Sequence, residues 1–351
     1  CSALIKNGHN IKLYVWKNKN KKLIKKNYEK ILKLFDLNYN FEIKNYPSIS
    51  PFGNSLFSSY YLSKMLDYTN IDFIIARNLR ACFFSSNKCY VYYETHKPFK
   101  YYNFIDRIFY KILVSKKMFL SLITISDFLI NDYNKIKIFK NIRKLKLRDG
   151  SNTNEHIISN SNGQSLNVGY IGSLYEGRGI EIIIKLSQLM KHISFNIVGG
   201  NDLEIKTFKK KYECSNIIFY GHLDYISSIK QMKNFDILLA PYQSNTTVPG
   251  AINTSQWMSP IKLFEYMSAK KPIITSDIKS LKEFMKDKYN CIMVKENNII
   301  EWQKAIQLII DDKKLANNIV ENAFTELKLK YTWDIRAKLI VKNFINIHKE
   351  N

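Results

Sequence analysis

One carboxylate interrupts an otherwise apolar helical segment: Glu265 lies in SPIKLFEYMSAKKPIITSD, residues 259–277. Apolar residues recur there at helical spacing, Ser259 can cap the helix, and PIIT at 272–275 predicts a buried parallel strand. A carboxylate on a packed helical face is costly unless it has a partner. Either it pairs with Lys262, three residues earlier, or it binds a ligand, and the residues alone leave both interpretations open.

A glycine-rich turn forms a candidate anion site in VGYIGSLYEGRGI, residues 168–180. Gly172 lets the chain turn sharply after a predicted strand, and two glycines flank Arg178 where the next helix begins. The N–H groups of a helix N-terminus, together with an arginine, bind anions such as phosphate. The spacing is not G-x-G-x-x-G, so the dinucleotide fingerprint is absent. An ordinary strand–helix connection is the alternative.

Two further strand ends are expected at the same rim of this sheet. Gly199 follows the strand in IVGGN, and Pro241 and Tyr242 follow the strand in LLAPYQ. A carboxylate at such a rim, here Glu265, suits the hydroxyls of a ribose. Lys262 suits a diphosphate.

The first half of the chain holds a second candidate cluster, in YETHKP at 93–98. Glu94, Thr95 and His96 come directly after a predicted strand, and Arg77 ends the preceding one. A lone histidine is often structural, but at the carboxyl end of a parallel strand it can also face a ligand. Both interpretations stay open.

Aromatic and basic residues interleave in FKYYNFIDRIFYKILVSKKMF, residues 99–119. This pattern suits an interfacial patch for a membrane or for a lipid-linked acceptor. The alternative is a helix that packs into the core and turns a basic face to solvent.

Strand-like and helix-like segments alternate twice along the chain, which predicts an α/β protein with two doubly wound parallel sheets. The predicted helices include those near residues 22–35 and 279–286. The Ser-, Asn- and Gly-rich stretch 148–165 between the two halves is the best linker. The expected domains are 1–150 and 151–330, followed by a terminal helix in 331–351. A ligand is expected in the cleft that faces the carboxyl ends of the strands.

Composition indicates a globular protein: 46% of the 351 residues are hydrophobic and 24% are charged. The formal charge of +24 is spread along a Lys-rich chain without a zinc-finger or RNA-binding motif, so specific nucleic-acid binding is not expected. A basic surface still favours anionic lipid head groups and phosphorylated ligands.

The five cysteines show neither metal-binding spacing nor a disulfide framework, which suggests a reducing cytoplasm. We find no signal peptide and no apolar run of transmembrane length, so membrane association is expected to be peripheral. The chain begins with CSALIKNGH, which is typical of the end of a helix. We therefore expect that a first strand and its loop are missing.

In its order of motifs the chain resembles the retaining glycosyltransferases of family 4, which have the two-domain GT-B fold. The resemblance covers nearly the whole chain and is strongest at 168–300, where GYIGSLYEGRGIEIII, FNIVGGN, IIFYGHLDY, DILLAPY and SPIKLFEYMSAKKPIITSD follow in family order. SPIKLFEYM is similar to the signature of one subgroup, and IIAR, ETH and RDGSN match that subgroup's first domain and linker. YTWDIRA at 331–337 resembles the family's last helix, which packs back across the first domain.

The resemblance implies roles for individual residues. Glu265 matches the second Glu of the family's E-x7-E motif and would hold the nucleotide ribose. Arg178 matches the cation that neutralises the donor diphosphate, and His96 matches the first-domain histidine near the transferred sugar. These three are the implied catalytic residues. The implied donor-binding residues are Gly172, Ser173, Arg178, Gly199, Pro241, Tyr242, Ser259, Pro260, Lys262, Leu263 and Glu265.

Two residues depart from the family pattern. Trp257 stands where the family has its sugar-contacting Glu, and the preceding TTVPGAINTSQW could supply other groups. Ser173 stands where the family has the first cation of an Arg/Lys pair. The missing amino terminus would have carried a Gly-rich loop of the site, so the chain is expected to be a fragment with impaired activity.

The resemblance therefore implies a retaining, metal-independent glycosyltransferase that needs no cofactor besides its nucleotide diphosphate sugar substrate. The expected acceptor is a saccharide or a lipid-linked saccharide, in the synthesis of cell-surface polysaccharide or lipopolysaccharide, at the inner face of the cell membrane. Two alternative functions remain, a sugar-nucleotide epimerase on the same fold and a non-catalytic partner subunit. The second is considered because Trp257 stands where the family has its sugar-contacting Glu.

Overall fold

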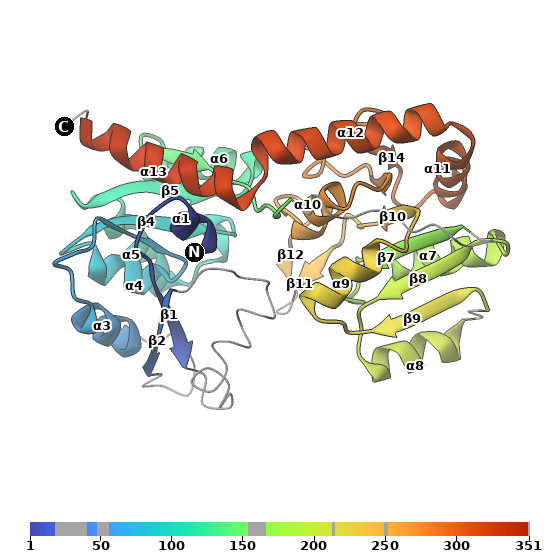
Figure 1. The fold of residues 1–351 in the computed structure, drawn as a ribbon. Helices are drawn as coiled ribbons and strands as arrows, with labels where there is room; N and C mark the ends of the chain where they lie inside the picture. Colours follow the sequence, from blue (N-terminus) through green and yellow to red (C-terminus); the bar gives the residue numbers. More distant parts are fainter. Residues whose placement is uncertain (18–40, 48–55, 154–165, 213–214, 249–251, 350–351) are drawn as a thin grey trace. The chain divides into compact units, whose positions relative to one another are not determined.

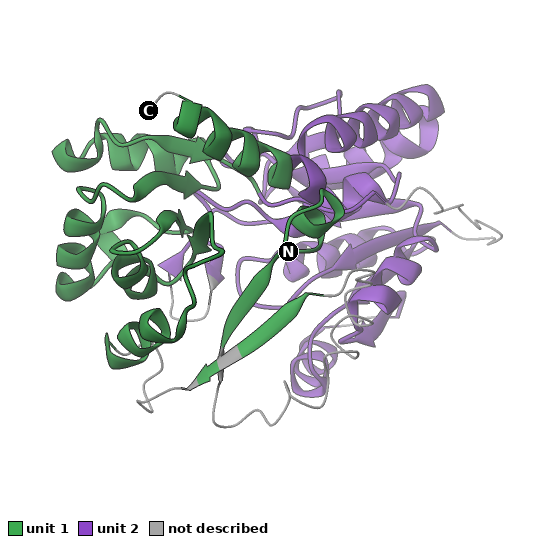
Figure 2. Cartoon of the chain, turned by 60° about the vertical axis from the view of Figure 1, so that its left-hand side comes forward, with its two compact units in different colours: residues 1–148, 336–351 green, residues 149–335 purple. Residues whose placement is uncertain are grey.

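A computed structural model describes residues 1–17, 41–47, 56–153, 166–212, 215–248 and 252–349. They form two compact units, residues 1–148 with 336–351 and residues 149–335 (Figure 2). The long interdomain stretch falls largely outside the described residues, as does the helix expected near 22–35.

The first unit is built on parallel strands (Figure 1). A four-stranded sheet has the order β3-β4-β5-β6, and β1 pairs with β2 in parallel. The strands are β1 (Lys12–Lys17), β2 (Glu42–Pro47), β3 (Phe73–Ala76), β4 (Tyr90–Thr95), β5 (Phe119–Thr124) and β6 (Lys144–Lys146). The helices are α1 (Ser2–Lys6), α3 (Leu56–Met65), α4 (Leu79–Ser85), α5 (Phe104–Leu113), α6 (Asp127–Asn134) and most of α13 (Trp333–Lys349), with the short η1 (Phe99–Tyr101) and η2 (Lys137–Phe139).

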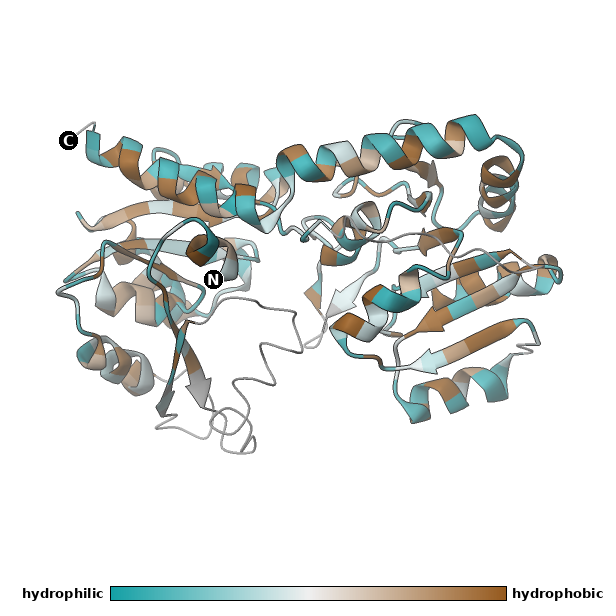
Figure 3. Ribbon diagram, viewed as in Figure 1, coloured by the Kyte–Doolittle hydropathy of each residue, from teal (hydrophilic) through white to brown (hydrophobic). Residues whose placement is uncertain are grey.

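The first unit has a core on each face of the four-stranded sheet. One core is aromatic, with Tyr110, Tyr133 and Phe139 fully buried. On the other, Tyr92 packs with Ile340 of α13 and donates a hydrogen bond to Asn343 Oδ1 at 2.9 Å. The apolar stripe of α13, whose hydrophobic and polar residues alternate in Figure 3, therefore packs onto the sheet of the first unit.

The second unit contains a six-stranded parallel sheet of order β14-β13-β10-β7-β8-β9 and a two-stranded hairpin, β11-β12. The strands are β7 (Asn167–Ile171), β8 (Ser194–Val198), β9 (Ile217–Gly221), β10 (Ile237–Ala240), β11 (Thr247–Val248), β12 (Ile252–Asn253), β13 (Ile273–Ser276) and β14 (Ile292–Val294). The helices are α7 (Ile180–Leu189), α8 (Asp202–Lys211), α9 (Tyr225–Met232), α10 (Ile261–Ser268), α11 (Ile299–Asp311) and α12 (Lys313–Lys330).

Strand order explains where the second unit can bind a ligand. The chain runs outward from β7 through β8 to β9, and then returns to place β10 on the other side of β7. Loops after β7 and β10 leave the sheet in opposite directions, which opens a crevice at their carboxyl ends. Central strands such as β10 are buried along their whole length, as continuous apolar runs in a parallel sheet predict.

The α/β prediction with parallel sheets is confirmed, but one predicted helix is wrong. Residues 279–286 form turns, in which Leu281 N donates to Ile278 O and Phe284 N donates to Leu281 O. The buried side chains there have nearly helical spacing, and this spacing alone predicted a helix. Ser280 Oγ donates to Ser255 O at 2.5 Å and ties this segment to another loop.

Candidate active site

The turn after β7 packs closely against the loop after β10. Gly179, at the N-terminus of α7, has φ of 79°, and a Cβ there would lie 1.9 Å from Pro241 O. Gly177 has φ of 80°, and its carbonyl accepts hydrogen bonds from Gln243 N and Thr246 Oγ1, both at 2.9 Å. Glycine is needed here for its positive φ and for the close approach of two backbones.

Gly179→Ala is therefore expected to lower the free energy of unfolding by about 2 kcal/mol or more, because it adds strain and a collision with a backbone carbonyl. Gly8→Ala is a matched control, because Gly8 has φ of 84° but no atom within 4 Å of the position of a Cβ. Denaturant unfolding of both variants separates the two costs. Equal losses would contradict a role for the contact with Pro241.

Arg178 sits between the glycines of this turn and reaches Tyr242. Its Cζ lies 5.4 Å from the centroid of the Tyr242 ring. Burial raises the pKa of Tyr242, while the Arg178 charge lowers it and the Glu265 charge raises it, so both charged groups act electrostatically on the Tyr242 hydroxyl. Arg178 Nε is buried and has no hydrogen-bond partner in the described part of the chain. A buried donor without a partner is costly unless a ligand accepts from it.

Glu265 lies inside the second unit with a side chain only 7% exposed. Lys262 Nζ is 3.1 Å from Oε2, so the ion pair considered from the sequence is present. The geometry is not that of a hydrogen bond, and Oε2 has no hydrogen-bond partner among the residues described. The carboxylate is thus paired in charge but still has an acceptor to offer.

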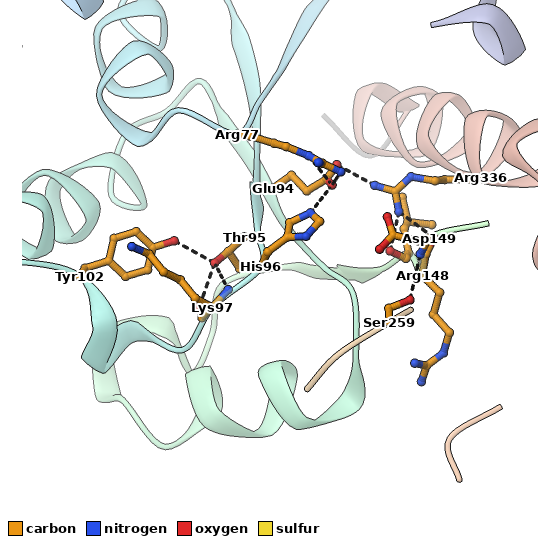
Figure 4. A network of polar contacts seen from close by, with 11 residues as sticks. Arg77, Glu94, Thr95, His96, Lys97, Tyr102, Arg148, Asp149, Ser259 and Arg336 are labelled. Carbon is orange, nitrogen blue, oxygen red and sulfur yellow. Dashed lines mark hydrogen bonds and ion pairs between the residues drawn. The ribbon is translucent and has the colours of Figure 1, made fainter. Parts of the chain in front are cut away.

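The start of α10 differs from the prediction. Pro260, not Ser259, is the N-cap residue, and no side chain caps the helix. Ser259 Oγ instead accepts a hydrogen bond from Asp149 N at 3.2 Å (Figure 4). The first turn of α10 therefore keeps N–H groups that no capping side chain satisfies, and these can bind an anion.

Four other predicted donor-binding residues have structural contacts. Leu263 is completely buried in a core cluster, so its side chain is not available to a donor. Gly172 N donates to Val198 O at 2.9 Å, and a Cβ on Gly199 would lie 1.8 Å from Gly172 O. These glycines bring the ends of β7 and β8 together. Ser173 O accepts a hydrogen bond from the hydroxyl of Tyr170 at 2.8 Å.

The loop before Trp257 folds back on the glycine-rich turn. Trp257 itself is buried. Thr246 is buried as well, and its single hydroxyl proton is shared between Gly177 O and Gln243 O, which lies 2.6 Å from Oγ1. Glu296, two residues after β14, was not predicted from the sequence; it accepts hydrogen bonds from the N and Oγ of Ser244. Its only sequence signal is its place just after a strand.

In the first unit, Glu94 is the centre of a polar cluster at the end of β4 (Figure 4). Its carboxylate accepts from Arg77 Nη2 at 2.6 Å, Arg336 Nη2 at 2.6 Å and His96 Nε2 at 2.7 Å. Burial alone would raise the pKa of Glu94, but the hydrogen bond from His96 and the charges of Arg336 and Arg77 lower it to about 2. Glu94 is therefore a buried anion that fixes the position of His96.

Arg336, which the sequence analysis did not single out, completes this cluster from α13. Its Nη1 donates to Leu147 O at 2.5 Å and to Arg148 O at 2.9 Å. It therefore joins the end of β4, the chain after β6 and the last helix. The signal in the sequence was an arginine within YTWDIRA, the segment expected to return to the first domain.

The depressed pKa of Glu94 predicts loss of stability in acid. The carboxylate has an ordinary pKa of 4.5 in the unfolded chain and about 2 in the folded one. Its stabilising effect is complete above pH 4.5 and is lost as the pH falls toward 2. The free energy of unfolding, measured against pH, should fall less steeply in this range for Glu94→Gln, and an unchanged slope would contradict the assignment.

No metal site or membrane span stands out in the part of the chain that the structure describes. Among the residues that the structure describes, no cluster of three His, Cys, Asp or Glu side chains could hold a metal ion. None of the described helices is both long and apolar enough to cross a bilayer.

Comparison with known proteins adds sequence and fold relationships. The sequence model of the family described as glycosyl transferases group 1 matches residues 151–326, which is half of the chain. Two uncharacterized glycosyltransferases of Methanocaldococcus jannaschii are 29% identical over 182 residues and 22% identical over 209 residues. These alignments cover 50% and 58% of this chain and 44% and 55% of the relatives, so the chain spans about half the length of the curated relatives it matches.

Solved structures with the GT-B fold superimpose along nearly the whole chain. Sucrose-phosphate synthase of Thermosynechococcus elongatus matches with a TM-score of 0.73 and 14% identity, covering 100% of this chain and 92% of its own. HepE of Anabaena, in complex with UDP, gives a TM-score of 0.66 at 13% identity and covers 96% of this chain and 100% of its own. A glycosyltransferase of Rickettsia africae gives 0.68 at 14% identity, with coverages of 100% and 94%. At these identities the likeness shows the fold.

Proposed function

Since the chain belongs to the group 1 glycosyl transferases, we propose that it moves a sugar from a nucleoside diphosphate donor to an acceptor hydroxyl, with retention at the anomeric carbon. The observation that carries this proposal is Glu265. It is a buried carboxylate whose charge acts on Tyr242, at the topological switch point of a parallel sheet, with an unsatisfied oxygen.

The donor would be held at its ribose and at its diphosphate. The carboxylate of Glu265 accepts hydrogen bonds from the ribose hydroxyls. Arg178, Lys262 and the uncapped N-terminus of α10 bind the diphosphate and stabilise the negative charge that grows on it as the sugar leaves. In this proposal, these groups offset the negative charge without a metal ion. HepE and S. aureus TarM have both been solved in complex with UDP, so a uridine nucleotide is the first to test.

The transfer itself needs few groups from the protein. The bond from the anomeric carbon to the diphosphate breaks, and the acceptor oxygen bonds to the same face of that carbon. The acceptor proton passes to the departing diphosphate, so no enzyme nucleophile is required. His96, held by Glu94, binds the transferred sugar. A saccharide or lipid-linked acceptor used in cell-surface polysaccharide synthesis is the proposed substrate class.

Two measurements test the proposal. Calorimetry with UDP, GDP and ADP should show one nucleotide bound more tightly than the others, and NMR of the product from the matching α-linked donor should show an α-linked sugar. A β-linked product would overturn retention. A nucleotide sugar changed only at one sugar carbon would instead identify an epimerase. If none of the nucleotides binds, a non-catalytic subunit is favoured. Buried Trp257, which stands in place of the family's sugar-contacting Glu, is the feature that suggests this alternative.

A further inference from the structure

Helix α5 turns large apolar side chains to solvent. Phe104 is 77% exposed and Ile105 is 57% exposed, while Ile108 and Ile112 are exposed as well. Only Tyr110 and Leu113 of this helix are buried. A helix at an ordinary protein surface shows polar residues opposite its core face. The solvent face of α5 is instead apolar, unlike the basic face considered from the sequence.

Helix α3 also turns polar side chains toward the core and aromatic side chains toward solvent. It buries Ser58, Ser59 and Ser63 together with one apolar residue, Leu62, and it exposes Phe57 and Tyr60, the first of them by 71%. Burying hydroxyls while exposing aromatic rings gives up hydrophobic stabilisation. Such a pattern marks a surface that another body covers.

The two exposed faces belong to one surface, because α4 joins them. The Tyr60 ring of α3 packs edge-on against Phe84 of α4, with 5.3 Å between centroids. Phe84 in turn lies 6.0 Å from Phe109 of α5. Phe109 lies next to the exposed stripe of α5 around the helix, so that stripe adjoins α4. The α3–α5 face is defined by Phe57, Tyr60, Phe104, Ile105, Ile108 and Ile112.

Positive charge borders this face. Lys111 is exposed on α5, Lys100 is exposed on η1 just before it, and Lys64 is exposed at the end of α3. The one acidic residue of α5, Asp106, is neutralised by Arg80, whose Nε lies 2.7 Å from its Oδ1. Residues 56–117 contain ten Lys and Arg against four Asp and Glu. The expected partner therefore has an apolar interior and a negatively charged surface.

We propose that the α3–α5 face binds the surface of an anionic lipid bilayer. Phe104, Ile108 and their neighbours insert between the head groups, and the lysines at the border contact the lipid phosphates. A bilayer fits better than a folded protein, because it offers an apolar interior directly beneath negative charge. This inference goes beyond sugar transfer and does not depend on the identity of the donor.

Sedimentation with vesicles tests the proposal. The chain should bind vesicles of phosphatidylglycerol and phosphatidylcholine in equal parts, and bind pure phosphatidylcholine at least about tenfold more weakly. The double variant Phe104→Ser/Ile108→Ser should bind the anionic vesicles about tenfold more weakly than the unmodified chain. Lys100→Glu/Lys111→Glu should do the same, and its loss should resemble the effect of high salt.

Controls separate the membrane from other partners. Leu203→Ser on α8 removes a side chain that is 75% exposed and lies in the second unit, and it should leave vesicle binding unchanged. Thermal unfolding should show that all variants fold. The proposal is overturned if the unmodified chain ignores anionic vesicles or if Phe104→Ser/Ile108→Ser binds them normally. It is also overturned if the chain dimerises through this face in sedimentation equilibrium and only the double variant is monomeric.

Discussion

Glu265→Ala is expected to weaken binding of the preferred nucleoside diphosphate by about a hundredfold. The carboxylate would make two charge-assisted hydrogen bonds to the ribose, each contributing about 1.5 kcal/mol. Removing it also leaves the ammonium of Lys262 beside an emptied site, where it had been 3.1 Å from Oε2. Calorimetric titration of the nucleotide selected from UDP, GDP and ADP measures the loss.

Two further variants make this prediction specific. Glu265→Gln keeps the shape and one acceptor oxygen, so it should lose only about tenfold, because its hydrogen bonds to the ribose are no longer charge-assisted. Glu321→Ala removes an exposed glutamate from α12 of the same unit and should bind the nucleotide normally. If Glu265→Ala binds the nucleotide with full affinity, Glu265 does not bind the ribose. This conclusion is independent of the vesicle experiments, which test membrane binding.

Glu94→Ala is expected to lower the free energy of unfolding by about 3–5 kcal/mol. The substitution removes the anion that holds Arg336 and His96, and it leaves the buried guanidinium of Arg336 without its carboxylate. Breaking a buried ion pair by removal of one partner has a cost of this size, because the remaining charge stays desolvated. Chemical denaturation of the whole chain provides the measurement.

A matched variant shows whether burial is the reason. Arg77 is an ion-pair partner of the same carboxylate, but its side chain is 63% exposed. Arg77→Ala should therefore lower the free energy of unfolding by less than about 1 kcal/mol, as for a surface pair. Similar losses for Glu94→Ala and Arg77→Ala would contradict the view that desolvation sets the cost.

The sequence by itself determined the fold class. Alternation of strands and helices, with continuous apolar runs such as ILLA in β10, requires parallel strands buried on both faces. It also placed Glu265, Arg178 and Tyr242 at strand ends or helix starts, and the carboxyl ends of parallel strands share one rim. Local spacing was sufficient for these conclusions, because each depends on contacts a few residues apart.

Tertiary structure alone decided which side chains are partners. Glu94 and Arg336 are hydrogen-bonded across 242 positions of the chain, and no spacing rule connects them. Ser259 was expected to cap α10, but it binds the backbone of Asp149, a choice that depends on where the interdomain chain passes. The helical periodicity at 279–286 likewise gave way to turns, in which the Ser280 hydroxyl donates a hydrogen bond to the backbone carbonyl of Ser255 in another loop.

Exposure was the other property that only the folded chain could show. The apolar residues of α3 and α5 have the composition of core segments, and hydrophobicity does not say which face a neighbouring element covers. Packing of α4 between them left Phe57 and Phe104 outside and turned Ser58 and Ser59 inward. The sequence therefore sets which segments can be buried, and the geometry of the assembled sheets and helices decides which of them are.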